Sequence, residues 1–209
     1  MLISKRVQGS LLTFTIAGIL GLVGVVLRGP VPLPSVDVNT WVNAVTSESY
    51  FLAQLLTLIA YVLPYFGFWG IYASLAEQSE VERTAFWGFT LSIIGTSLAI
   101  AMLGVFSYVS PYLAELYLLG EQNLPDIVTQ IATGRPLWVN LTGGFLYLFG
   151  TFLLGWSIWR SGRFKRWPGF LIALHGLCLV FGFMFFPVLI LSWVFLIVAG
   201  LGLFLYMDR

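Results

Sequence analysis

The apolar runs of this sequence contain no acidic or basic side chain except His175, which could also ligate a metal ion. The residue lies seven positions beyond Pro168, at the start of an apolar run. At 1.5 Å per helical residue, this places the imidazole about 10 Å into a membrane, close to the bilayer centre. A neutral imidazole at that depth still has one donor and one acceptor to satisfy, so the side chain needs partners.

Two roles for His175 follow from its position. It could be the single axial ligand of a porphyrin-type pigment, which needs a smooth helix face beside it. The glycines that would form this face are Gly169, Gly176 and Gly182. Alternatively, His175 is structural and hydrogen-bonds to a neighbouring helix, which is the commoner role of a lone buried histidine. The candidate partners are Ser92, Thr96 and Thr151. We favour the structural role and expect a neutral His175 in a colourless protein.

The other chemistry-bearing residues are too few for catalysis inside a membrane. The chain has one Cys and one His, which excludes a multi-ligand Cys/His metal site and a two-histidine haem within one copy. The apolar runs contain no Asp, Glu, Lys or Arg, so neither a paired-acid site nor a Ser/His/Asp set can be assembled there. We therefore expect a protein that is not an enzyme and that binds no metal and no cofactor.

The composition indicates a polytopic membrane protein. Of the 209 residues, 59% are hydrophobic, 17% are aromatic and only 9% are charged, and the mean hydropathy is +0.94. A soluble domain carries roughly 25% Asp, Glu, Lys and Arg, so this chain has too little charge to cover a water-facing surface. The net charge of +1 predicts no binding to nucleic acid.

Six apolar runs without charge are long enough to cross the roughly 30 Å hydrocarbon core. They are about Leu11–Leu27, Tyr50–Tyr72, Ala85–Tyr108, Leu137–Ile158, Pro168–Phe185 and Val188–Tyr206. The last two runs form one apolar stretch of 40 residues, which Pro187 should divide at a turn around Phe185–Val188. Pro64 should kink the second run. The sequence thus predicts one all-α domain over residues 1–209, a bundle of six transmembrane helices.

The distribution of positive charge predicts the orientation. With six spans and the N-terminus inside, one side holds eight Lys and Arg residues and the other holds two. The eight are Lys5, Arg6, Arg83, Arg160, Arg163, Lys165, Arg166 and Arg209, and the two are Arg28 and Arg135. Because cytoplasmic loops carry the excess of Lys and Arg, both termini should be cytoplasmic. We expect the inner membrane, or another internal membrane, of a bacterium.

Short amphipathic helices should lie on the outer face. Val36–Thr46 places apolar and polar residues on opposite sides at helical spacing, with Ser35 as the expected N-cap. Asp126–Thr133 shows the same pattern, with Pro125 in its first turn. A third piece, Tyr112–Leu119, is mostly apolar around Glu115. The first two pieces should lie flat on the membrane or cap the bundle.

The junction between the fourth and fifth runs reads Arg160-Ser161-Gly162-Arg163-Phe164-Lys165-Arg166-Trp167. This junction and the order of the six apolar runs together resemble a large bacterial family of six-span membrane proteins, which is known only as a domain of unknown function. That family often has an Arg-Ser, a short gap and then Pro-Arg-Trp, whereas this chain has Lys165 at the position of the proline. The resemblance implies six spans but no reaction, ligand or catalytic residue.

We expect a non-enzymatic protein that is an accessory or assembly subunit of a membrane complex or a binder of lipid-like molecules. Its partners would then be the lipid bilayer and other membrane subunits. A small-solute or lipid transporter is the first alternative. It is suggested by Pro64 and by a sequence similarity between Trp87–Gly95 and Pro168–Gly176, which could mark an internal repeat. A single-histidine pigment-binding subunit is the second alternative. A membrane enzyme would require the outer charged residues to converge on one pocket. These residues are Glu48, Glu115, Glu121 and Arg135.

Overall fold

The computed structural model describes residues 2–121, 123–182 and 185–206. Within these ranges every regular element is a helix, so the predicted all-α fold is confirmed. In chain order they are α1 Leu2–Arg28, α2 Val38–Val45, α3 Glu48–Val62, α4 Pro64–Leu75, α5 Ser79–Gly104, the π-helix η1 Val105–Val109, α6 Ser110–Leu118, α7 Leu124–Thr133, α8 Arg135–Ser161, α9 Arg166–Gly182 and α10 Phe186–Leu205.

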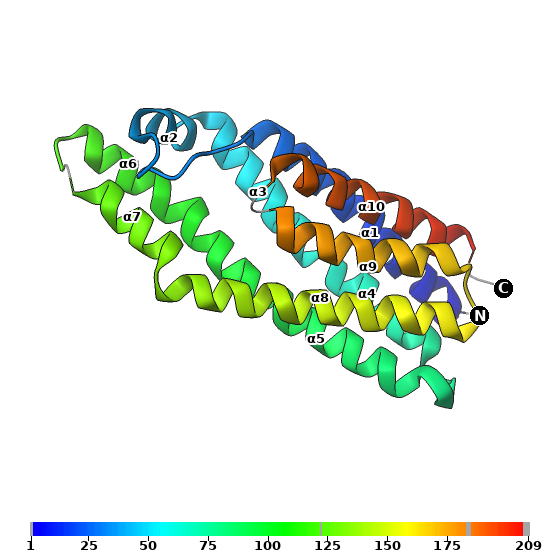
Figure 1. Cartoon of the computed structure of the whole chain (residues 1–209). Helices are drawn as coiled ribbons and strands as arrows, with labels where there is room; N and C mark the ends of the chain where they lie inside the picture. The colour runs from blue at the N-terminus through cyan, green and yellow to red at the C-terminus, as the bar shows by residue number, and fades with distance from the viewer. Residues whose placement is uncertain (1, 122, 183–184, 207–209) are drawn as a thin grey trace.

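The long helices form a closed ring. α1 packs on α10, α10 on α9, α9 on α8 and α8 on α5, while α4 contacts α5 and α3 and α4 both pack on α1. Figure 1 shows α2, α6 and α7 gathered at one end of this ring, and the start of α1 and the end of α10 at the other. The side-chain amide of Gln8 donates to the carbonyl oxygen of Phe204 at 3.2 Å, so the first and last helices are joined there.

Five helical segments are long and apolar enough to cross a membrane. They are Lys5–Arg28, Glu48–Leu75, Ser79–Leu118, Leu124–Ser161 and Phe186–Leu205. The predicted fifth span corresponds to α9, a shorter apolar helix of 17 residues. Its predicted end includes residues 183 and 184, which lie outside the described residues. The six-span count therefore stays a prediction, although the apolar helices themselves are present.

Glycines on α1 allow its neighbours to approach closely, as expected for small residues in membrane helices. A Cβ at Gly21 would collide with the indole ring of Trp193 on α10. A Cβ at Gly24 would come within 2.8 Å of the Ala53 carbonyl oxygen on α3. These contacts fix how α1 lies between α3 and α10, the two helices that bring Tyr61 and Trp193 to the candidate site.

Two of the sequence-based boundaries are wrong and one kink is confirmed. The second span breaks at Leu63, and Pro64 begins α4. The apolar piece Tyr112–Leu119 corresponds to α6, but α5, η1 and α6 form one uninterrupted helical segment from Ser79 to Leu118, so the third span does not end at Tyr108 as predicted. A π-turn lets the helix continue where the apolar run ends. The expected turn around Phe185–Val188 is also misplaced, because α10 already begins at Phe186.

Pro187 explains the second error. It lies in the first turn of α10, where a missing N–H removes no helical hydrogen bond. Phe185, just before the helix, has an extended backbone with φ −135° and ψ 102°. Pro187 therefore lies in the first turn of α10 and does not form a turn between two helices.

The outer helices form a cap with its own small core. The core contains Trp41, Val42, Val45, Tyr50, Ala114 and Val128, which come from α2, α3, α6 and α7. The N-cap of α2 is Asp37, not Ser35, because Asp37 is the last extended residue before the helix and its carboxylate accepts from the Thr40 N–H at 3.0 Å. The pKa of Asp37 lies below its usual value of 3.8 because two groups of Thr40 donate hydrogen bonds to the carboxylate. The backbone N–H has the larger effect and the side-chain hydroxyl the smaller one.

The basic loop Arg160–Arg166 lies at the opposite end of the ring from the cap and connects α8 to α9. Gly162 ends α8 with φ +65°, a left-handed conformation that glycine adopts without strain. Arg163 then donates from Nη1 to the Ser74 carbonyl oxygen at 2.6 Å, near the end of α4. One of the four cations in this loop therefore caps a helix of the preceding hairpin.

Candidate functional site

His175 lies on α9 and is hydrogen-bonded on both ring nitrogens. Its side chain is 1% exposed. Nε2 is 2.9 Å from the hydroxyl of Tyr147 on α8, and Nδ1 is 2.9 Å from the carbonyl oxygen of Ser192 on α10. The arrangement fits a neutral imidazole whose Nδ1–H donates to Ser192 and whose Nε2 accepts from Tyr147. His175 thus links three helices.

The expected hydrogen bond to a neighbouring helix is confirmed, but the expected partners are wrong. Thr96 donates to the Ser92 carbonyl oxygen at 2.7 Å, and Thr151 donates to the Tyr147 carbonyl oxygen at 3.0 Å. Both threonines therefore satisfy their hydroxyls within their own helices. The hydroxyl of Ser92 is buried without a partner in the described part of the chain.

The glycines expected to face a pigment instead face protein. A Cβ at Gly169 would lie 3.0 Å from Ile158 on α8, one at Gly176 would collide with Thr151 on α8, and one at Gly182 would lie 2.7 Å from Leu189 on α10. Pigment binding at His175 stays an alternative, and it would require Nε2 to exchange Tyr147 for a metal ion.

Aromatic rings surround the histidine. The ring centroids of His175 and Trp193 are 5.8 Å apart, and Tyr61 packs edge-on against Trp193 at 5.6 Å. Trp193 is 2% exposed, and its indole N–H has no hydrogen-bond partner among the described residues. A buried donor without a partner is uncommon, because it loses its hydration and gains nothing. Trp193 therefore has an unused donor beside the histidine.

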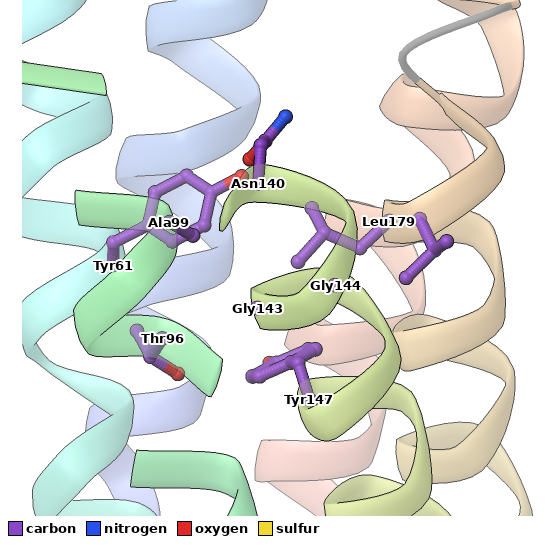
Figure 2. A pocket seen from close by; sticks show the side chains of 9 residues that line it. Tyr61, Thr96, Ala99, Asn140, Gly143, Gly144, Tyr147 and Leu179 are labelled. Carbon is purple, nitrogen blue, oxygen red and sulfur yellow. The ribbon is translucent and has the colours of Figure 1, made fainter. Parts of the chain in front are cut away.

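A groove leads from the outside of the ring towards this cluster. This shallow groove is open to the outside, has enclosed room for about one water molecule, and is bordered by α3, α5, α8 and α9. Its lining residues are Tyr61, Thr96, Ala99, Asn140, Gly143, Gly144, Tyr147, Leu179 and Val180. Figure 2 shows Tyr61, Thr96 and Ala99 on one side of the groove and Leu179 on the other, with Tyr147 on the helical turn below Gly144.

The groove continues inwards as a narrow second hollow that has no room for a water-sized molecule. The two hollows share Tyr61, Thr96, Tyr147 and Leu179, and the inner one also touches Pro64, His175 and Trp193. We call these connected hollows, with the residues that line them, the His175 groove.

Sequence reasoning identified His175 but not the residues around it. Tyr61, Tyr147 and Trp193 carry no sequence motif that separates them from the many other aromatic residues. One available signal was the small residues on the Tyr147 face of α8, since Gly143 and Thr151 lie four positions to either side. Such spacing places a large polar ring between small residues on one helix face.

The outer charged residues do not contribute to this groove. Glu48, Glu115, Glu121 and Arg135 are absent from the lining of both hollows. Within the described ranges, no cluster of three or more His, Cys, Asp and Glu residues could hold a metal ion. The groove therefore offers a mainly apolar surface with a few neutral hydrogen-bonding groups, which suits binding of an apolar molecule with few polar atoms.

Comparison with protein-family models, with curated proteins and with solved structures finds no match for this chain. The similarity around Arg160–Trp167 to the six-span family of unknown function therefore stays a prediction.

Proposed function

We propose that this chain is a six-span protein of a bacterial inner membrane, with both termini in the cytoplasm. Five helical segments of spanning length support this proposal. The 17 residues of α9 add about 26 Å of apolar helix, close to the roughly 30 Å hydrocarbon core. The start of α1 and the end of α10 lie at the same end of the ring, together with the basic loop Arg160–Arg166, as the excess of positive charge on that side requires.

Within the membrane, the protein acts as a non-enzymatic binder of a lipid-like molecule. The observation that carries this proposal is the His175 groove. It is apolar along its length, and its inner end holds hydrogen-bonding groups, of which the Trp193 N–H is unused by the described residues. In this proposal a hydrocarbon chain lies along the open outer side of the groove, and an oxygen-bearing group reaches Trp193 and Tyr61 when the closely packed inner side chains move apart.

The test is to fill the groove. In Gly144→Leu the new side chain starts from a Cβ position with its nearest neighbour, Val180, at 3.5 Å, so the helix can accept it while the groove becomes smaller. The protein purified in mild detergent should retain about tenfold less lipid by mass spectrometry than the wild type. Gly9→Leu is the matched control, because nothing lies within 4 Å of its Cβ position. Equal lipid content in both variants would reject the proposal.

A lipid or small-solute transporter is a second candidate. Pro64, at the break between α3 and α4, lines the inner hollow beside His175. Broken helices beside a central site are typical of transporters. Transport of fluorescent lipid between the leaflets of proteoliposomes, abolished in Pro64→Ala, would favour this function over binding alone. An accessory-subunit role would instead give a stoichiometric partner when the protein is purified from native membranes.

A further inference from the structure

A polar stripe runs along one face of α3, from the outer end of the ring to the His175 groove. It consists of Tyr50, Gln54, Thr57 and Tyr61, at spacings of four, three and four residues that place them on a single helix face. All four side chains are buried. Polar residues inside a membrane bundle are costly and are usually kept for packing or function. Thr57 satisfies its hydroxyl on the Ala53 carbonyl oxygen at 2.8 Å, whereas Gln54 does not satisfy its amide oxygen.

Gln54 is the strongest indication of a missing partner. Its side chain is 2% exposed, and Oε1 is buried with no hydrogen bond to the described residues. A buried amide oxygen without a donor is destabilising by about 1–3 kcal/mol. The Gln54 side chain also contacts the Tyr50 hydroxyl one turn earlier, so the group that it can offer to a ligand is its amide oxygen, which accepts from a hydroxyl.

Arg28 lies beside the outer end of this stripe. Gly24 packs on Ala53 and Thr57, so Arg28, one turn further along α1, reaches the beginning of α3. Its guanidinium is within electrostatic range of the Tyr50 and Tyr61 hydroxyls. Nε of Arg28 is buried without a hydrogen-bond partner, and no acidic side chain pairs with this arginine in the described part of the chain. A half-buried cation of this kind lacks an anion.

We propose that Arg28 and Gln54 bind the head group of an anionic phospholipid whose phosphate pairs with the guanidinium and whose free hydroxyl donates to the amide oxygen. This inference rests on the proposed function, since one hydrocarbon chain of the lipid then follows Tyr61 into the His175 groove. Charge complementarity selects the anion, because Arg binds phosphate through paired N–H groups. The unused acceptor on Gln54 requires a donor on the head group, which phosphatidylglycerol has and an ionised fatty acid lacks. The net negative charge of phosphatidylglycerol distinguishes it from zwitterionic phosphatidylethanolamine, which should bind more weakly.

The experiment compares two outer arginines in the complete protein. The wild type, Arg28→Gln and Arg135→Gln are reconstituted in detergent with phosphatidylglycerol, phosphatidylethanolamine or oleate, and bound lipid is counted by native mass spectrometry. Both substitutions remove one positive charge from the same side of the membrane, so their effect on topology is matched. Arg28→Gln should bind about tenfold less phosphatidylglycerol, and Arg135→Gln should bind as much as the wild type.

Further variants identify which part of the proposal fails, if one does. Arg28→Lys keeps the charge and should retain an intermediate amount of lipid, which excludes a general loss of folding. Gln54→Leu should reduce the preference for phosphatidylglycerol over oleate. Equal binding of oleate and phosphatidylglycerol by the wild type would overturn the role of Gln54. Equal binding of phosphatidylglycerol by Arg28→Gln and Arg135→Gln would overturn the head-group site.

The groove variant separates this inference from the proposed function. If Gly144→Leu loses lipids of every head group while Arg28→Gln binds normally, the groove stands and the head-group site is rejected. If Arg28→Gln loses phosphatidylglycerol while Gly144→Leu binds normally, the head-group site stands and the groove as the binding place of the chain is rejected.

Discussion

The hydroxyl of Tyr147 lies 2.9 Å from Nε2 of His175 and joins α8 to α9 in the interior of the ring. Both side chains are buried, so water cannot replace either partner. The same imidazole reaches Ser192 on α10 through Nδ1. This hydrogen-bonded chain holds three helices in register at the inner end of the groove.

Removal of the Tyr147 hydroxyl should therefore destabilise the protein. In Tyr147→Phe, Nε2 of His175 becomes a buried acceptor without a donor, which is destabilising by about 1–3 kcal/mol. Thermal unfolding in detergent should show a lower midpoint. Tyr65→Phe is the control, because the hydroxyl of Tyr65 bonds to Ser97 at an exposed position and its loss should change stability by less than about 0.5 kcal/mol. Equal midpoints for the two variants would contradict the structural role of the Tyr147–His175 bond.

Substitution of Gly21 should separate α1 from α10. The Cβ of Gly21→Ala would overlap the indole of Trp193, which is fully enclosed and cannot move aside easily. Overpacking of this kind is destabilising by about 1–3 kcal/mol. Gly9→Ala, on the same helix but with open space around it, should be neutral or slightly stabilising. The difference can be measured by thermal unfolding, and identical behaviour of the two variants would show that α1 and α10 are not in close contact at Gly21.

The outer cap should loosen in acid. Because the pKa of Asp37 is lowered in the folded state by the Thr40 hydrogen bonds, its contribution to stability is complete above the ordinary value of 3.8 and is lost as the pH falls through the lower, folded-state pKa. Amide exchange at Thr40 and Trp41 should accelerate in this range. In Asp37→Asn, the side chain still caps α2 but does not titrate there, so the acceleration should disappear. A pH dependence that persists in this variant would assign it to another group.

A charge in the small core of the cap should release α2. Trp41 is 2% exposed, so Trp41→Asp removes a large buried ring and introduces a carboxylate without a partner. The expected loss is about 3–5 kcal/mol in the stability of the cap. Amide exchange over Val38–Val45 should become fast. The control is Asn43→Asp, which adds the same charge at an exposed position of the same helix and should leave exchange slow. Fast exchange in the wild type would mean that α2 is not docked.

The proposed topology can be tested with two serine-to-cysteine substitutions, which hardly change the size of the side chain. In a Cys178→Ala background, Ser35→Cys and Ser79→Cys each place a thiol at an exposed position, on opposite ends of the ring. With the basic end in the cytoplasm, a membrane-impermeant thiol reagent should label Ser35→Cys in intact cells and Ser79→Cys only after lysis. The reverse labelling pattern would invert the orientation.

The helices were predictable because their physical cause is local. An uninterrupted run of apolar residues without charge must form a helix in a membrane, whatever its neighbours are. Exact ends were less predictable. Pro187 can either break a helix or begin one, and Ser35 and Asp37 are both good N-caps, so the choice depended on the backbone before each helix.

The partners of His175 were not predictable for a different reason. Periodicity shows which residues share a face of one helix, but it does not show how that face is turned towards the next helix. Thr96 and Thr151 looked suitable because they are polar, yet each could satisfy its hydroxyl four residues earlier in its own helix. Tyr147, whose hydroxyl is too far from its own backbone to do the same, was the residue that reached the histidine.

The pairing of the first helix with the last has a consequence for biosynthesis. Gln8 and Phe204 are hydrogen-bonded although 196 positions separate them along the chain. At a translation rate of about 5–20 residues per second, the ribosome makes the second of these residues roughly 10–40 s after the first. Throughout that interval, the glycine face of α1 has no α10 to cover it. Lipid or the membrane insertion machinery must occupy this face until the ring closes, so α1 completes its native contacts only when nearly the whole chain has been synthesised.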